Sequence, residues 1–355
     1  MGPGLDTHSE LFFSGWLTPI FALIVGALGA GQASSFGQAQ ATAAQAYIDS
    51  NPTFVLKQFS AEQPIRLIAY GDMRFTDPAI TTGTNPKVRQ WLAEKIGQEH
   101  PQALMLTGDM PFVGEKPEDW AEYQRETASW KADGFPVFPT MGNHEVYHDR
   151  AKGIANYLAN YPAIQGHRYY SAVVGPVEVI SLDMNSGGGP YSEQYRWFAA
   201  QLAHVPATVE FVFILYHHPW VADTQSQLFA NVPSKDALAF RTLLESRASS
   251  MHAKAVVFNG HIHNYERFER GGVEYVVTGG GGAEPYPIFY RGSHDLYRDM
   301  GFPVYHYLTL EVRDHALHAV MWKVIDPKAA ELSVEAKDSF LIRANPMPVG
   351  KRKKP

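Results

Sequence analysis

The chain has 355 residues, of which 45% are hydrophobic, so it can build one large α/β domain or two small ones around a sizeable core. Its formal net charge is −6 at pH 7, which excludes a general electrostatic attraction to nucleic acid, and we expect no nucleic-acid partner. It contains no cysteine, which excludes disulfides, thiolate zinc sites and a cysteine nucleophile.

The amino-terminal segment is predicted to direct export to the periplasm or the exterior. Residues 11–30 are mostly apolar, and an A-x-A pattern follows at 39–41, as in a cleaved signal peptide. No Lys or Arg precedes Lys57, so an uncleaved membrane anchor and an ordinary buried helix stay open as alternatives. We divide the chain into a signal peptide or anchor (1–41), a linker (42–62), one domain (63–343) and a basic tail (344–355).

From residue 65 onward, apolar runs alternate with helical patterns. Strands are expected within 65–72, 103–109, 135–145, 177–183, 209–219, 254–263 and 273–282. The last part, 304–342, is expected to form short strands, for example at 304–312 and 317–325. Helices are expected near 87–99, 118–131, 193–202 and 236–247. Strands that alternate with helices predict an α/β fold with sheets buried on both faces.

Several of these strands end in a polar side chain that can bind a metal ion. The side chains are Asp72, Asp109, Asn143, His217, His261 and His263. Ligands bind outside the carboxyl ends of strands in open α/β sheets, so we expect residues from distant segments to meet in one crevice. Carboxylate, amide and imidazole groups without sulfur suit transition metals such as Fe, Mn, Zn or Co.

Such ligands indicate phosphate ester chemistry. If Asp109 bridged two ions about 3.5–4 Å apart, the pair could clamp a phosphate and lower the pKa of a bound water, so that hydroxide attacks phosphorus. The pair would also stabilise the entering and leaving oxygens. The sequence therefore predicts a metal-dependent phosphoesterase whose partner is a small phosphate ester.

Five short blocks stand in order along the chain. They are GDMR at 71–74, GDM at 108–110, GNHE at 142–145, HHP at 217–219 and GHIH at 260–263. In this order they resemble the blocks of the calcineurin-like metallophosphoesterases, and GHIHNYER followed by YVVTGGGG resembles the purple acid phosphatase branch. The resemblance implies a two-sheet α/β sandwich flanked by helices, with a dinuclear metal site at one edge.

The resemblance also implies roles for individual residues. The first metal site would take Asp72 and His263, the second would take Asn143, His217 and His261, and Asp109 would bridge the two. His144 would be the catalytic residue that protonates the leaving group. In YHHPW the ligand is His217, two residues before the proline, which leaves His218 for the substrate.

Two positions depart from the family pattern. Arg74 stands where the wider family has histidine, and Phe112 stands where purple acid phosphatases have tyrosine. Because a guanidinium stays protonated, Arg74 cannot be a ligand. We therefore expect a weak or vacant first site and no purple colour. We assign Arg74 to substrate binding, since its charge can face a phosphate oxygen, with a surface salt bridge as the alternative.

Other functions stay open. The segment HEVYH at 144–148 fits the HExxH signature of zinc proteases, although the proline and the Gly-Asn turn just before it argue against the helix that this signature needs. The incomplete first site leaves open a relative that binds phosphate without turnover. Within phosphoesterase chemistry, the acid-phosphatase-like block favours a monoester over a diester.

Overall fold

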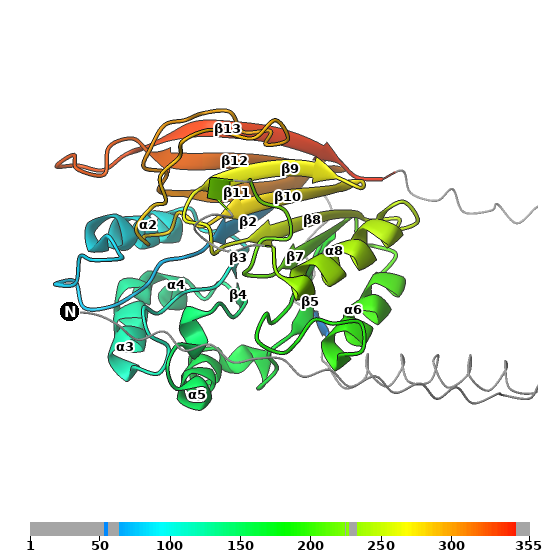
Figure 1. Cartoon of the computed structure of the whole chain (residues 1–355), viewed down its shortest axis with the longest axis horizontal. Coiled ribbons are helices and arrows are strands. Elements are labelled where there is room, and N and C mark those ends of the chain that lie inside the picture. Colours follow the sequence, from blue (N-terminus) through cyan, green and yellow to red (C-terminus); the bar gives the residue numbers. More distant parts are fainter. Residues whose placement is uncertain (1–52, 56–63, 224, 227–232, 346–355) are drawn as a thin grey trace, which may run out of the picture. The chain divides into compact units, whose positions relative to one another are not determined.

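The computed structural model describes residues 53–55, 64–223, 225–226 and 233–345 (Figure 1). The predicted signal peptide or anchor at 1–41 lies outside the described residues, as do most of the linker (42–62) and of the basic tail (344–355). Within the described ranges, no helix combines the length and the apolar character needed to cross a membrane.

Two mixed β-sheets organise the described part of the chain. One has seven strands in the order β1-β5-β6-β7-β8-β10-β9, and the other has six in the order β13-β12-β11-β2-β3-β4. The strands of the first are β1 (Thr53–Val55), β5 (Tyr170–Val174), β6 (Val177–Ser181), β7 (Phe211–Leu215), β8 (Lys254–Asn259), β9 (Tyr265–Arg270) and β10 (Val273–Thr278). Those of the second are β2 (Ile65–Tyr70), β3 (Ala103–Leu106), β4 (Val137–Pro139), β11 (His306–Arg313), β12 (Ala316–Val324) and β13 (Val334–Arg343).

Helices flank the sheets. They are α2 (Pro86–Gln98), α3 (Pro117–Glu126), α4 (Ala128–Asp133), α5 (Arg150–Asn160), α6 (Glu193–Ala203) and α8 (Lys235–Ala248), with short 3-10 turns at His144–Val146 and Pro162–Ile164. Figure 1 shows α6 and α8 beside β7 and β8, and α3, α4 and α5 grouped near β4.

Side chains of β7 alternate between two cores. Phe211, Phe213 and Leu215 belong to a core that also contains residues of β2, β3 and β11 from the other sheet. Val212 and Ile214 pack instead with residues of α6 and α8. This is the period of two that a strand shows when both of its faces are covered. The predicted two-sheet sandwich with flanking helices is confirmed.

The helix expected near 118–131 is divided into α3 and α4 at Thr127. Its backbone leaves helical geometry (φ −103°, ψ 17°), and its hydroxyl donates to the Tyr123 carbonyl at 2.7 Å. A local bond of this kind competes with the helical ladder. After the break, the Trp130 indole donates to the carbonyl of Ala93 at 2.9 Å, which ties α4 to α2.

Some elements were not predicted. The strand expected within 135–145 ends at Pro139, and the residues after it form a loop that closes on itself, since the Gly142 amide donates to Glu145 at 2.7 Å. Helix α5 lacked an expectation, as did β5 and β9, whereas β13 lies almost wholly within the region 304–342 that was expected to form short strands, without bounds of its own. In β13 many side chains are polar and exposed at the sheet edge, so the apolar pattern that marks a strand is weak there.

Candidate metal centre

The candidate site lies where parallel strands end. The residues that follow the strands are Asp72 after β2, Asp109 after β3, Asn143 after β4, His217 after β7 and His261 after β8. Strands β2, β3 and β4 are parallel neighbours in one sheet, and β7 and β8 are parallel neighbours in the other. The carboxyl ends of each set therefore lie at one edge of its sheet. Asn143 lies close to both His217 and His261, so the two edges meet at the site.

The backbone aims several of these side chains. Asp72 (φ 59°), Asp109 (φ 56°) and His261 (φ 70°) adopt the left-handed conformation. This conformation is costly for residues other than glycine, and such residues cluster at functional sites. A Cβ on Gly142 would lie 2.2 Å from Asp109 Oδ1. Any residue other than glycine at position 142 would therefore collide with Asp109, and the two ligand loops can approach this closely only with glycine there.

One half of the centre, which we call the imidazole side, consists of Asn143, His217 and His261. Asn143 Oδ1 lies 3.1 Å from His217 Nε2 and 3.0 Å from His261 Nδ1. His217 Nε2 is also 3.3 Å from Asp109 Oδ1. Atoms that bind one ion at about 2.0–2.2 Å lie roughly 3 Å apart, so these four atoms have the spacing of a ligand set.

A backbone carbonyl selects the ring nitrogen that faces the centre. His217 Nδ1 lies 2.8 Å from the carbonyl oxygen of Thr107. A carbonyl can only accept, so Nδ1 carries the proton and Nε2 presents its lone pair. Partners of this kind orient metal-binding histidines in general.

The other half, which we call the arginine side, consists of Asp72, Arg74 and His263. His263 Nδ1 donates to the carbonyl of Glu284 at 2.7 Å, which leaves Nε2 at 3.6 Å from Asp72 Oδ1. This buried Nε2 has no hydrogen-bond partner among the described residues. Arg74 Nη2 lies 3.9 Å from Asp109 Oδ2, the carboxylate that both halves face.

The charges of the centre favour a bound cation. Burial raises the pKa of Asp72 to about 7, and the neighbouring Asp109 adds to this rise while His217 opposes it. Burial would also raise the pKa of Asp109, but His217, His144 and Arg74 hold it well below its usual range. Asp109 Oδ2 is buried without a hydrogen-bond partner in the described part of the chain. Asp72, Asp109 and His217 offer donor atoms within 4.8 Å of one another and can bind a metal ion.

His144 faces the same carboxylate. Its Nδ1 donates to the carbonyl of Phe112 at 2.6 Å, and its Nε2 lies 3.8 Å from Asp109 Oδ2. Burial lowers the pKa of His144, although Asp109 opposes this change. The Tyr147 ring stacks on the imidazole with centroids 5.3 Å apart. His144 therefore presents Nε2 as its proton-exchanging atom.

Glu145 has a positioning role that the sequence did not indicate. This buried carboxylate accepts from the backbone amides of Asp109 (3.1 Å), Met110 (2.8 Å) and Gly142 (2.7 Å). It therefore joins two of the ligand loops. Burial, and after it Asp109, raises the pKa of Glu145 to about 8.

The segment HEVYH does not form the helix that a zinc protease needs. His144–Val146 is a single 3-10 turn, and His148 is exposed with a left-handed backbone (φ 62°). The two histidines therefore do not share a helical face, and the protease alternative is wrong.

His218 and Tyr286 border the two halves. The His218 ring lies 4.1 Å from that of His261, between centroids, and burial lowers its pKa. The Tyr286 ring stacks on His263 with centroids 4.3 Å apart. Tyr286 stands outside the five motif blocks. The structure thus brings every predicted site residue into one cluster.

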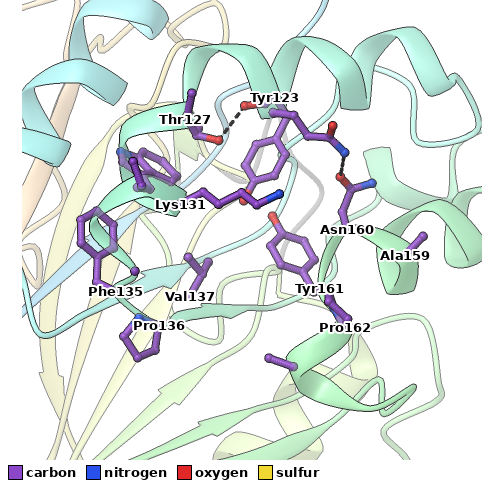
Figure 2. Close-up of a pocket in the computed structure, with 16 residues that line it drawn as sticks. Tyr123, Thr127, Lys131, Phe135, Pro136, Val137, Ala159, Asn160, Tyr161 and Pro162 are labelled. Carbon is purple, nitrogen blue, oxygen red and sulfur yellow. Dashed lines mark hydrogen bonds between the residues drawn. The ribbon is translucent and has the colours of Figure 1, made fainter.

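A separate cavity of about 820 Å³ lies at the amino end of β4, whereas the metal centre lies at its carboxyl end (Figure 2). Its walls include Tyr123, Lys131, Phe135 and Tyr161. None of the predicted site residues lines it, so it is not part of the metal centre.

Comparisons with known proteins agree with this geometry. A family described as calcineurin-like phosphoesterase matches residues 65–265. Purple acid phosphatase 22 of Arabidopsis thaliana is 26% identical over 231 residues, which cover 62% of this chain and 49% of that protein. The chain therefore spans about half the length of the curated relatives it matches.

Two solved structures share the fold. The purple acid phosphatase PPD1 from yellow lupin (Lupinus luteus) superposes with a TM-score of 0.63 at 17% identity, over 80% of this chain and 54% of that one. GAP50, described as the anchor in the inner membrane complex of Plasmodium, superposes with a TM-score of 0.55 at 17% identity, over 79% and 89% of the two chains. With the family match over more than half of its length, this chain belongs to the calcineurin-like phosphoesterases, and it is similar to purple acid phosphatases among them.

Proposed function

We propose that this protein is a metal-dependent enzyme that hydrolyses phosphate monoesters. One observation carries the proposal: successive donor atoms of Asp109, His217, Asn143 and His261 lie 3.0–3.3 Å apart, which is the spacing of ligands around an ion. The proposed ligands on the arginine side are Asp72 and His263. The donors are oxygen and nitrogen only, which suits Fe, Mn or Zn.

A bound ion would act as a Lewis acid toward the phosphoryl oxygen and would acidify water. Proton transfer and phosphate binding are the roles of the chain's own side chains. His144 holds its Nδ1 proton on the Phe112 carbonyl, so Nε2 is the atom that can take up a second proton and pass it to the leaving oxygen. Arg74 donates to a phosphate oxygen, and His218 borders the substrate.

Two features support a monoester. The segment GHIHNYER and the glycine-rich run after it resemble acid phosphatases, and the curated relatives reported above are named purple acid phosphatases. A phosphodiesterase of the same fold is the first alternative. The second is a relative that binds phosphate without turnover, since the fold also occurs in a protein described as an anchor.

The test is a substrate panel on the metal-loaded protein. The purified chain would be stripped, reloaded in turn with Zn, Mn and Fe, and assayed with p-nitrophenyl phosphate and bis(p-nitrophenyl) phosphate. We expect faster release from the monoester with at least one ion. Faster diester hydrolysis would favour the diesterase, and no turnover with any ion would favour the binding protein.

We also propose that the chain is exported, with 1–41 as the targeting segment and membrane anchoring as the alternative. The test is cell fractionation with amino-terminal sequencing of the mature protein. A new amino terminus near residue 41 in the exported fraction is expected, whereas an intact terminus in the membrane fraction would indicate an anchor.

A further inference from the structure

We propose that the guanidinium of Arg74 takes the place of a second metal ion, so that the centre works with one ion and one fixed organic cation. The inference deepens the proposed function and rests on it, because it concerns how the same site would hold a phosphate. It is argued from the position of Arg74, from the donors around it and from its unused hydrogen bonds.

Arg74 is held in place rather than free on the surface. Its amide donates to the carbonyl of Asp109 at 3.1 Å, with a left-handed backbone (φ 53°). Its Nη1 donates to the carbonyl of Gly83 at 3.5 Å, and its guanidinium carbon lies 5.9 Å from the centre of the Phe112 ring. Only 15% of the side chain is exposed, so the alternative of a surface salt bridge does not describe it.

The charge of Arg74 acts on the residues that would bind a first-site ion. Its Nη2 lies 3.9 Å from Asp109 Oδ2, and Asp109 offers donor atoms within 4.8 Å of those of Asp72. A guanidinium cannot lose its proton at accessible pH. A divalent ion between Asp72 and His263 would therefore meet a permanent like charge, which disfavours its binding.

The donors on the arginine side are also too few for an ion of its own. Among the described residues, carboxylate and imidazole donors that lie mutually within 4.8 Å form the group Asp72, Asp109 and His217, to which the arginine side contributes only Asp72. His261 is also outside this group, but it joins the imidazole side through Asn143 Oδ1 at 3.0 Å. Phe112 offers no ligand atom. The donors therefore gather around one point shared with the imidazole side.

The guanidinium keeps donors available for an anion. Arg74 Nε is buried without a hydrogen-bond partner in the described ranges. Nη2 lies 3.9 Å from Asp109 Oδ2, which is beyond hydrogen-bonding distance. An arginine fork can donate two parallel bonds to a phosphate, so Arg74 can hold two phosphate oxygens beside the ion.

The first experiment counts metal. The full chain would be equilibrated with excess Zn or Mn, freed of unbound ion by gel filtration, and analysed for metal per protein. We expect about one ion per chain in the wild type. Arg74→His should raise the count to about two, because histidine is a ligand and tolerates a left-handed backbone better than most residues.

A matched control is Arg168→His. Arg168 is also partly buried and pairs with Asp183, another aspartate that follows a strand, but no predicted ligand contacts it. We expect Arg168→His to leave the metal count unchanged. Two ions in the wild type, or an equal rise in both variants, would overturn the inference.

The second experiment measures binding of inorganic phosphate by calorimetry on the metal-loaded protein. Loss of charged hydrogen bonds predicts that Arg74→Ala weakens binding about 10- to 100-fold, and that Arg74→Lys recovers part of it. Unchanged affinity in Arg74→Ala would overturn the inference even if Arg74→His did not fold. If the chain binds one ion and its phosphate binding depends on Arg74 but no ester is hydrolysed, the inference holds and the proposed enzymatic function fails. If the chain hydrolyses esters with two bound ions, the proposed function holds and the inference fails.

Discussion

The imidazole side and the arginine side of the centre surround the same buried carboxylate, Asp109, but they neutralise it differently. On the imidazole side, Asn143 and His217 present lone pairs, so these groups need a cation between them. On the arginine side, Arg74 brings its own positive charge to 3.9 Å from Asp109 Oδ2. The imidazole side therefore has the groups of a metal ligand set, whereas the arginine side forms an ion pair with the same carboxylate.

In the function proposed above, this difference assigns the bound ion mainly to the imidazole side. The pKa of His217 illustrates it: burial alone would lower this pKa, yet Asp109 raises it to about 9. The centre therefore attracts positive charge strongly at this point. Changes to either side should consequently have different effects, which we order from the largest to the smallest.

Asp109→Asn should remove the feature that both sides share. The amide keeps the shape but loses the charge that His217, His144 and Arg74 face. We expect loss of bound metal on gel filtration and a fall in kcat of about 10³-fold or more. The matched control is Asp183→Asn, which removes a buried charge paired with Arg168 and should cost stability while metal stays bound. Equal metal content in both variants would break the comparison.

His144→Ala should separate chemistry from metal binding. His144 Nε2 faces Asp109, but its imidazole lies outside the donor atoms of the imidazole side. We expect metal content to be kept and kcat to fall about 10²–10⁴-fold. His148→Ala, in the same segment but exposed, should change neither quantity. Loss of metal in His144→Ala would show that this residue is a ligand instead.

Gly142→Ala should disturb the imidazole side through its backbone. The added Cβ would lie 2.2 Å from Asp109 Oδ1 and 2.7 Å from the Asp109 amide, so the ligand loops must shift. We expect a destabilisation of about 1–3 kcal/mol by thermal unfolding, with weaker metal binding in titration. Gly189→Ala, where a Cβ meets nothing within 4 Å, is the control and should leave metal binding intact.

Glu178→Gln should show what happens to a buried carboxyl that has neither an ion nor an arginine. Burial raises the pKa of Glu178 to about 7, and only a hydrogen bond with Ser171 opposes this. Between pH 4.5 and 7 the folded state holds a proton that the unfolded state has lost, so stability falls as pH rises through this window. The free energy of unfolding of the variant should therefore exceed that of the wild type by about 1–3 kcal/mol at pH 8 but not at pH 4.5, which a higher Tm at pH 8 alone would show.

The control for this pH dependence is Glu331→Gln, an exposed residue between β12 and β13. It should give similar differences in Tm at both pH values. A pH-independent effect of Glu178→Gln would mean that burial does not govern its ionisation.

Much of the fold followed from local signals. Helix α2 begins at a proline after Asn85, whose side chain accepts from the Val88 amide at 3.2 Å, and such caps are visible in sequence. Helix α5 was missed because its amino half (RAKG) carries few apolar residues and its packing depends on Gly153, where a Cβ would lie 1.9 Å from the Glu145 carbonyl oxygen. A close approach of two backbones leaves no periodic pattern in the sequence.

The amino-acid sequence by itself determined which residue types stand at the strand ends, and that an arginine replaces a ligand at position 74. Only the tertiary structure decided that these residues meet and which ring nitrogen each histidine presents. The Thr107 carbonyl that orients His217 is 110 positions away, and the Asp72 carboxylate that accepts from the His261 amide is 189 positions away. Local patterns encode contacts within a helix or a strand, whereas these contacts exist only after the two sheets have packed against each other.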